Sequence, residues 1–248
     1  NDVVTGGDGD DTINGGAGND NINGGNGNDR VVISADANLN ADDTIVGGDG
    51  TDTLNFTAVI TDGAATLNAF SGFEVLLLEP AGTSTLTLSN FIGNQTFTRV
   101  DFGNVGGGTM TANNVASAVT DIRLIEGVTG DTVVFDRLVD NTTNTVAISA
   151  RNTTAQTITA ATLNDEEFVT YSSVNAAADV TITTLNAADL LTLTVSGEGD
   201  LIVTNAITDH GFPPALEGTQ ADTDLAAGAD QARASSMRLT DQLDRLAP

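Results

Sequence analysis

The chain runs Gly6-Gly7-Asp8-Gly9-Asp10-Asp11-Thr12-Ile13-Asn14 and then repeats this pattern at once. Further copies occupy residues 15–23, 24–32 and 47–55. Each copy has nine residues, with Asp in the sixth place and an aliphatic residue in the eighth. Self-similarity at a fixed period is typical of repeat architectures, in which each unit buries its apolar side against its neighbours.

Two further stretches are incomplete copies. Residues 38–46 keep Asp43 and Ile45 in the sixth and eighth places but have lost the glycines. Asp2-Val3-Val4-Thr5 reads as the last four residues of a copy. We therefore interpret the chain as beginning inside a repeat, and so as a piece of a longer protein.

Nine residues suit a turn of six followed by a strand of three. Glycines permit the positive φ angles that turn backbone carbonyls inward, and the sixth-place Asp adds a carboxylate. Such an oxygen-lined cleft suits a hard cation with a high and flexible coordination number, which favours Ca²⁺ over Zn²⁺ or Mg²⁺. Two copies make one coil of 18 residues, so we expect Asp11 to stack on Asp29 and Asp2 on Asp20.

The charge of the repeats supports a metal independently. Residues 1–55 hold 11 Asp, no Glu and one basic residue, Arg30, a net charge of −10. Stacking these carboxylates in register would be strongly repulsive without cations, so metal binding would supply folding free energy. The predicted calcium-binding residues are Gly6, Gly7, Asp8, Gly9 and Asp11 in the first copy; Gly15, Gly16, Ala17, Gly18 and Asp20 in the second; Gly24, Gly25, Asn26, Gly27 and Asp29 in the third; Gly47, Gly48, Asp49, Gly50 and Asp52 in the fourth; and Asp2 and Asp43 in the incomplete copies.

These copies resemble the glycine-rich calcium-binding nonapeptide GGxGxDxUx of the RTX (repeats-in-toxin) family, and they cover about a fifth of the chain. The resemblance implies a right-handed parallel β-roll in which turn carbonyls and the sixth-place Asp hold Ca²⁺ between stacked turns. It also implies a secreted bacterial protein. We assign residues 1–57 to this calcium-binding roll.

Strand signals continue over residues 58–208. Thr alternates with aliphatic residues, as in Leu191-Thr192-Leu193-Thr194-Val195, which is the pattern of half-buried strands. The expected strands centre near Leu86, Phe97, Ile122, Val133, Val146, Ile158, Val169, Ile182, Leu193 and Val203. Both a continued Thr-rich β-solenoid and a β-sandwich fit this spacing. We favour the solenoid because remnants of the calcium turn persist before Val133 and Leu201; each remnant is a further calcium site or an ordinary Asp/Gly turn.

Overall composition predicts an all-β protein and limits its partners. Hydrophobic residues make up 40% of the chain and aromatic residues 4%, and Cys is absent. The formal net charge of −26 argues against binding nucleic acid or an anionic membrane surface. No apolar run is long enough to span a membrane. For residues 209–248 we expect a linker and a short helical tail, which is either part of an RTX-type export signal or packs on the last coil.

No enzyme is predicted. The sequence lacks GxSxG, HExxH and Walker motifs, and His210 lies beside a Gly-Phe-Pro-Pro turn. The acidic pairs Asp42-Asp43 and Glu166-Glu167 are expected to point to opposite faces of strands, unlike a hydrolytic carboxylate pair.

Three classes of function remain. The order of the Gly-rich and Thr-rich parts resembles RTX-type bacterial surface-layer proteins, which implies a structural cell-surface protein that assembles with copies of itself through calcium, with cell-surface polysaccharide as a further partner. The alternatives are an RTX adhesin and the export and folding module of a secreted protease or lipase.

Overall fold

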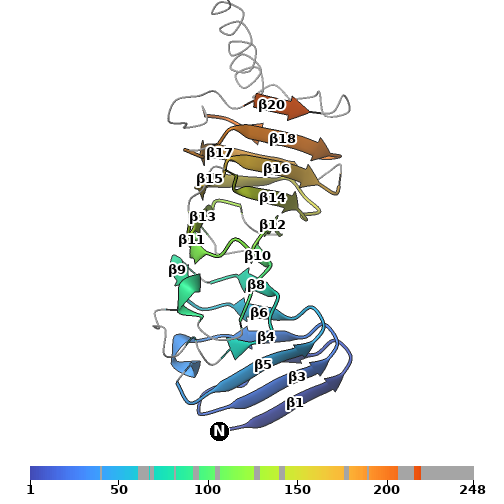
Figure 1. Cartoon of the computed structure of the whole chain (residues 1–248), viewed down its shortest axis with the longest axis vertical. Coiled ribbons are helices and arrows are strands. Elements are labelled where there is room, and N and C mark those ends of the chain that lie inside the picture. Colours follow the sequence, from blue (N-terminus) through green and yellow to red (C-terminus); the bar gives the residue numbers. More distant parts are fainter. Residues whose placement is uncertain are drawn as a thin grey trace, which may run out of the picture.

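The computed structural model describes residues 1–39, 41–60, 67, 70–80, 82–91, 95–103, 107–125, 129–139, 143–175, 179–188, 190–205 and 215–218. Over these residues the chain winds as a solenoid, with one coil stacked on the next along the long axis (Figure 1). Most coils contribute one strand to each of two sides. We call these the odd-numbered and even-numbered sides after their strands.

The even-numbered side is one continuous sheet of ten strands. In order they are β2 (Thr12–Ile13), β4 (Arg30–Ile33), β6 (Thr53–Phe56), β8 (Val75–Leu78), β10 (Arg99–Phe102), β12 (Asp121–Leu124), β14 (Thr145–Ala150), β16 (Phe168–Ser173), β18 (Thr192–Gly197) and β20 (Ala215–Gly218).

The odd-numbered side is divided into two sheets. The first holds β1 (Val3–Asp8), β3 (Asn21–Asn26), β5 (Thr44–Asp49) and β7 (Phe70–Ser71). The second holds β9 (Ser84–Thr87), β11 (Thr109–Val115), β13 (Thr132–Arg137), β15 (Gln156–Asn164), β17 (Val180–Asn186) and β19 (Leu201–Val203). Two 3₁₀ turns, η1 (Asp36–Asn38) and η2 (Leu88–Asn90), lie in corners.

All pairings between neighbouring described strands are parallel. A β-sandwich is built from antiparallel sheets. The parallel pairing therefore confirms the predicted solenoid and shows that the sandwich alternative is wrong.

The aliphatic eighth place of each nonapeptide forms the core of the roll. Ile13, Ile22, Val31 and Leu54 are buried, as is Ile45 of the incomplete copy. Alternate side chains of a strand point to opposite faces, so the seventh and ninth places of the four full copies, which are polar except for Val32, are directed away from this core. One aliphatic residue in nine is enough because each coil covers the next.

Five phenylalanines fill the interior where the odd-numbered side changes sheets. Phe56, Phe70, Phe73, Phe91 and Phe97 are buried, and their neighbouring ring centroids lie 5.2–6.4 Å apart. Aromatic packing at these separations adds to the burial of apolar area. This cluster joins the glycine-rich roll to the Thr-rich coils.

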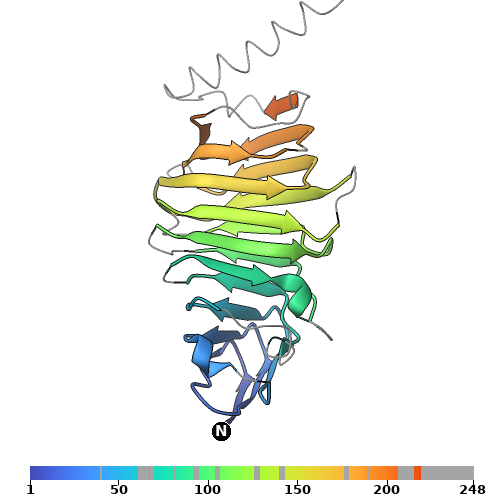
Figure 2. The ribbon, with the colours of Figure 1, turned by 90° about the vertical axis from the view of Figure 1, so that its left-hand side faces the viewer.

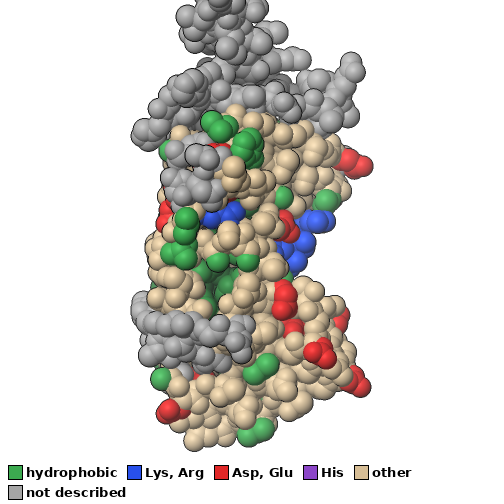
Figure 3. All heavy atoms as spheres, in the orientation of Figure 1, with side chains coloured by type: hydrophobic (Ala, Val, Ile, Leu, Met, Phe, Trp, Pro, Cys, Tyr) green, Lys and Arg blue, Asp and Glu red, His purple; other side chains and the backbone are tan. Residues whose placement is uncertain are grey.

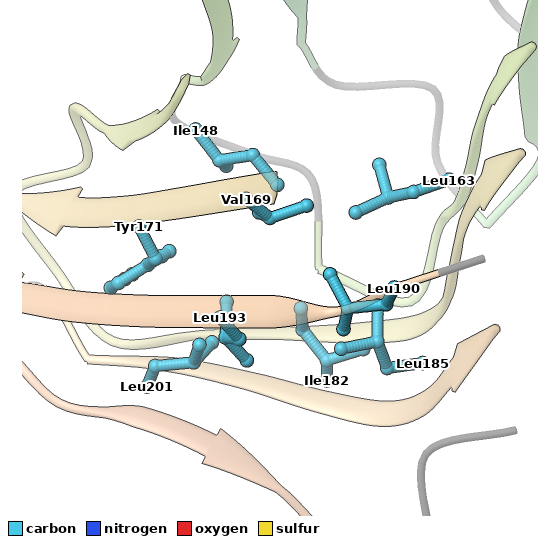
Figure 4. Close-up of a pocket in the computed structure, with 9 residues that line it drawn as sticks. All are labelled: Ile148, Leu163, Val169, Tyr171, Ile182, Leu185, Leu190, Leu193 and Leu201. Atoms are coloured by element: carbon cyan, nitrogen blue, oxygen red, sulfur yellow. The ribbon is translucent and has the colours of Figure 1, made fainter. Parts of the chain in front are cut away.

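Farther along the axis the interior is aliphatic. The close-up in Figure 4 shows a cavity between the sheets, and its lining is apolar. The lining residues are Ile148, Leu163, Val169, Tyr171, Ile182, Leu185, Leu190, Leu193 and Leu201. We interpret this space as a packing gap in the core.

The strand predictions for residues 58–208 mostly agree with the structure. A described strand contains each expected centre except Phe97, which precedes β10. The sequence interpretation missed β11. Residues 215–218, within the expected linker, form a strand that pairs with β18. The predicted helical tail and His210 lie outside the described residues, among which no helix is long and apolar enough to cross a membrane.

Candidate metal centre

The glycine-rich corners form two stacks on opposite edges of the roll. The first edge carries the corners that follow β1, β3 and β5, and we call it the cation edge. Its predicted residues are Gly6, Gly7, Asp8, Gly9, Asp11, Gly24, Gly25, Asn26, Gly27, Asp29, Gly47, Gly48, Asp49, Gly50 and Asp52. The opposite edge carries Asp2, Gly15, Gly16, Ala17, Gly18, Asp20 and Asp43. Acidic side chains are visible on the right-hand edge of the lower third in Figure 3.

The sixth-place carboxylates form a ladder along the axis. The backbone N–H of Asp11 donates to Oδ1 of Asp29 at 2.8 Å, and the N–H of Asp29 donates to Oδ1 of Asp52 at 2.8 Å. On the opposite edge the N–H of Asp2 donates to Oδ1 of Asp20 at 2.8 Å. The predicted stacking of Asp11 on Asp29 and of Asp2 on Asp20 is thereby confirmed.

The second oxygen of these carboxylates has no such partner on the cation edge. Oδ2 of Asp11, Asp29 and Asp52 is buried and accepts no hydrogen bond, and the Asp29 and Asp52 residues are 1% and 0% exposed. Leaving a buried polar atom unpaired costs free energy, and the cost is larger for a charged group. A cation beside each Oδ2 would remove this cost.

Backbone carbonyls face the same spaces. A Cβ atom added to Gly6 would meet Oδ2 of Asp11 at 2.6 Å and would lie still closer to the carbonyl oxygen of Gly24. One added to Gly24 would clash in the same way with Oδ2 of Asp29 and the carbonyl oxygen of Gly47. The first glycine of a copy therefore leaves open a small space, bounded by one carboxylate oxygen and by a carbonyl oxygen of the next coil. We call each such space a cradle.

The second glycine of each copy has a different role. Gly7, Gly25 and Gly48 have φ angles of 111°, 115° and 124°, which residues with a Cβ rarely adopt. A Cβ on Gly25 or Gly48 would also run into the backbone of the coil beneath. These glycines let the corners stack closely and in register.

The opposite edge lacks this arrangement. A Cβ on Gly15 would meet Cδ1 of Ile22 at 2.6 Å and Oδ2 of Asp20 at 3.0 Å, with no carbonyl of the next coil among its nearest atoms. The corner that follows in the stack contains η1 in place of glycines. Asp43 nevertheless keeps its place in the ladder, because its Oδ1 accepts the N–H of Asp20 at 2.8 Å.

The electrostatics of Asp52 also favour a cation. Burial raises the pKa of this carboxyl above 3.8, and the negative charges of Glu74, Asp29 and Asp49 raise the pKa further, whereas the hydrogen bond from the Asp29 N–H lowers it. A carboxylate in this setting is costly to keep ionised. Oxygen ligands from carboxylates and carbonyls are those that Ca²⁺ prefers. The residues present thus fit calcium: Asp11 with Gly24, and Asp29 with Gly47, would hold it.

Acidic residues also precede β13 and β16, but there the carboxylate oxygens accept hydrogen bonds from backbone N–H groups. Oδ1 of Asp131 accepts the N–H groups of Gly107 and Gly108 at 2.6 and 3.2 Å. Oε2 of Glu167 accepts the N–H of Asn144 at 2.7 Å. These contacts favour an ordinary turn at Asp131 over a further calcium site.

The acidic pair Glu166-Glu167 lies in the corner between β15 and β16, so the expectation that it belongs to a strand is wrong. Glu166 forms a buried ion pair with Arg137, and Glu167 accepts a hydrogen bond from the backbone N–H of Asn144. The two carboxylates thus have separate structural partners. The same expectation is wrong for Asp42-Asp43, which precedes β5. There Oδ1 of Asp43 accepts the N–H of Asp20, and Oδ2 of Asp42 accepts an N–H of the Asn19 side-chain amide at 3.2 Å.

Sequence reasoning missed Gly72 and Glu74 as continuations of the cation edge. Oε2 of Glu74 accepts the N–H of Asp52 at 2.8 Å, as the sixth-place Asp residues do in the coils below. The available signal was an acidic residue directly before the aliphatic run Val75–Leu78, because Asp52 likewise directly precedes β6. Within the described part of the chain no three acidic, His or Cys side chains converge on one point, so each cradle pairs a single carboxylate with backbone oxygens.

Comparison with known proteins agrees with this geometry. The family model of the RTX calcium-binding nonapeptide repeat matches four copies, over residues 1–31 and 39–58. Comparison with curated proteins and with solved structures gave no match. RTX repeats bind calcium, occur in secreted bacterial proteins and form a structural β-roll that is not itself catalytic. Residues 1–31 and 39–58 of this chain are therefore calcium-binding RTX nonapeptide repeats.

Proposed function

We propose that this chain belongs to a calcium-dependent structural protein of the bacterial cell surface, which folds when it meets calcium outside the cell and then assembles with copies of itself. The observation that carries the calcium-dependent folding is the row of buried, unpaired carboxylate oxygens on the cation edge. Without a metal the roll must bury them uncompensated, and with a metal they become ligands.

Calcium binding can distinguish the outside of a cell from the inside, because the sites need only a modest affinity. Extracellular calcium modules typically bind with dissociation constants of about 10⁻⁴–10⁻³ M. At such an affinity the roll would remain unloaded inside a cell and fill after export. The net charge of −26 acts in the same direction, since it keeps unloaded copies apart.

A low-charge face supports assembly. Strands β9, β11, β13, β15, β17 and β19 lie side by side (Figure 2) and contain only Asp136 and Arg137 as charged residues; Arg137 is buried. Their outward side chains are mainly Thr and Asn, and we call this surface the threonine face: Thr85, Thr111, Thr157, Thr159, Thr162, Thr181, Thr183, Thr184 and Asn186. Two copies can approach through it with little of the repulsion that their net charge imposes elsewhere.

Calcium-dependent folding is tested by circular dichroism. The β signal should rise as calcium replaces a chelator, and Asp29→Asn should move this rise to higher calcium. Asp36→Asn, in η1 and outside the cation edge, is the matched control. Equal β content with and without calcium would refute the folding role.

Assembly is tested on the full-length parent protein by light scattering and negative-stain microscopy during a calcium titration. Ordered sheets should appear with calcium. Thr159→Asp places a charge on the threonine face and should prevent them, whereas Thr170→Asp, exposed on the even-numbered side, should not. A protein that folds with calcium but stays monodisperse would favour the adhesin or the export module instead.

A further inference from the structure

We infer that the cation edge holds one more cation site than the nonapeptide repeats provide, between Asp52 and Gly72. The family match ends at residue 58, so the upper half of this site lies beyond it. The inference concerns the number and position of the ions, and it can fail while the calcium-dependent folding of the roll stands.

The lower half of the site is a complete nonapeptide corner. Oδ1 of Asp52 accepts the N–H of Asp29, which leaves Oδ2 as the free oxygen of a residue that is 0% exposed. This Oδ2 accepts no hydrogen bond. Asp52 therefore has the same free oxygen next to the coil above it as Asp29 and Asp11 have.

The upper half repeats the geometry with a shortened corner. Val46 pairs with Ser71, so Gly72 stands beside Gly47, the first glycine of the fourth copy. A Cβ on Gly47 would meet Oδ2 of Asp52 at 2.7 Å and would lie still closer to the carbonyl oxygen of Gly72. The same pair of atoms bounds the two cradles below, so a third cradle is present although the glycine-rich motif has ended.

Other contacts hold this corner in place. Gly72 has a φ of 70°, and Oε2 of Glu74 accepts the N–H of Asp52 at 2.8 Å. The side chain of Gln95 brackets the Phe73 peptide, accepting its N–H at 3.0 Å and donating to its carbonyl oxygen. Phe70 and Phe73 anchor both sides of the corner in the phenylalanine cluster. The Gly72 carbonyl is thus fixed by the Thr-rich coils as well as by the roll.

A cation in this cradle would join the two parts of the solenoid. Its carboxylate comes from the last repeat, and its carbonyl comes from the corner between β7 and β8. This lies where the first odd-numbered sheet ends and the even-numbered sheet continues. The site would take Ca²⁺, since its donors are of the same chemical class as those below.

The test compares Asp52→Asn with Asp131→Asn in the whole chain. Asn keeps an oxygen for the Asp29 N–H but replaces the free Oδ2 by an amide nitrogen, which does not bind a cation. Asp131 is equally buried and also precedes a strand, but its Oδ1 caps two N–H groups. Equilibrium dialysis with isotopic calcium should find one ion fewer per chain in Asp52→Asn, and an unchanged number in Asp131→Asn. An unchanged number in Asp52→Asn, or the same loss in both variants, would overturn the inference.

A measurement on the unmodified chain covers the case in which Asp52→Asn does not fold. Gly72-Phe73 and Gly211-Phe212 are the two Gly-Phe pairs of the sequence. Labelling with ¹³C-carbonyl glycine and ¹⁵N-phenylalanine therefore selects two carbonyl resonances, those of Gly72 and Gly211. Replacing calcium by cadmium in the folded protein should move the Gly72 carbonyl resonance. A Gly72 resonance that stays in place through the exchange would reject the site.

Discussion

The two oxygens of a sixth-place carboxylate have different roles. Oδ2 is the unpaired oxygen of the cradle, and Oδ1 of Asp29 and Asp52 accepts an N–H from the coil beneath. The hydrogen bond fixes the direction of the side chain before any ion arrives. Asn could still accept the N–H with its single side-chain oxygen, but it has no second oxygen to bind a cation, which explains why Asp is needed at the sixth place.

The first glycine of a copy can be tested separately from backbone strain. Gly24→Ala adds a Cβ that fills the cradle of Asp29 and Gly47, so we expect the loss of one calcium ion per chain, measured by equilibrium dialysis. Gly107→Ala is the control, because Gly107 lies outside the repeats and has a φ of 92° and open space at its Cβ position. It should lower the free energy of unfolding by about 1–2 kcal/mol and retain every ion. Full calcium binding by Gly24→Ala would contradict the cradle.

Among the elements, the corner between β15 and β16 depends on a buried ion pair. Arg137 and Glu166 are 5% and 0% exposed, and Arg137 also donates to the carbonyl oxygens of Ala116 and Val119. Glu166→Ala leaves the guanidinium without a counter-ion, and we expect it to destabilise the fold by about 3–5 kcal/mol. The double substitution Arg137→Met with Glu166→Leu should cost less. Chemical denaturation in saturating calcium measures both, and an equally large loss in the double variant would disprove the charge argument.

Strand β10 provides a test of pH dependence. Burial raises the pKa of Asp101 above 3.8, although Arg99 and Arg123 act in the opposite direction. The folded chain therefore holds this proton more readily than the unfolded chain, so the contribution of Asp101 to stability rises as the pH falls through its folded-state pKa. The free energy of unfolding should thus gain more in the wild type than in Asp101→Asn as the pH falls from 7 toward 3.8, the ordinary pKa of Asp. The same pH dependence in the wild type and in Asp101→Asn would refute this.

The elements also show what the sequence could predict. In the roll the first, second, sixth and eighth places of the nonapeptide each have a physical role, and the stacking of Asp11 on Asp29 followed from the period alone. Strand β11 gave a weak signal because its interior residues include Met110 and Ala112, which are not β-branched, and its register shifts before Val115. The cradle at Gly72 was hidden because its corner has lost the glycine motif, and only strand pairing places Gly72 beside Gly47.

Across the whole molecule, stability should follow the axis. Each coil contacts mainly its neighbours, so local unfolding can begin at one end and spread. On removal of calcium, hydrogen exchange should lose protection first in β1–β6, while β11–β18, which carry satisfied carboxylates such as Asp131, should lose it last. Mass spectrometry of peptides along the chain measures this order. Simultaneous loss over the entire chain would show that the coils unfold as one unit.

The corner at η1 has a practical consequence. Partner residues on adjacent coils are 18 apart at Asp11 and Asp29 but 23 apart at Asp20 and Asp43, and the ladder hydrogen bond has the same length, 2.8 Å, in both cases. None of the η1 residues Asp36–Asn38 is buried, and the strands on either side keep their parallel pairing with the neighbouring coils. A foreign peptide grafted at residues 36–38 would therefore be displayed once per molecule. It would lie on the edge opposite the cation edge, away from the cradles.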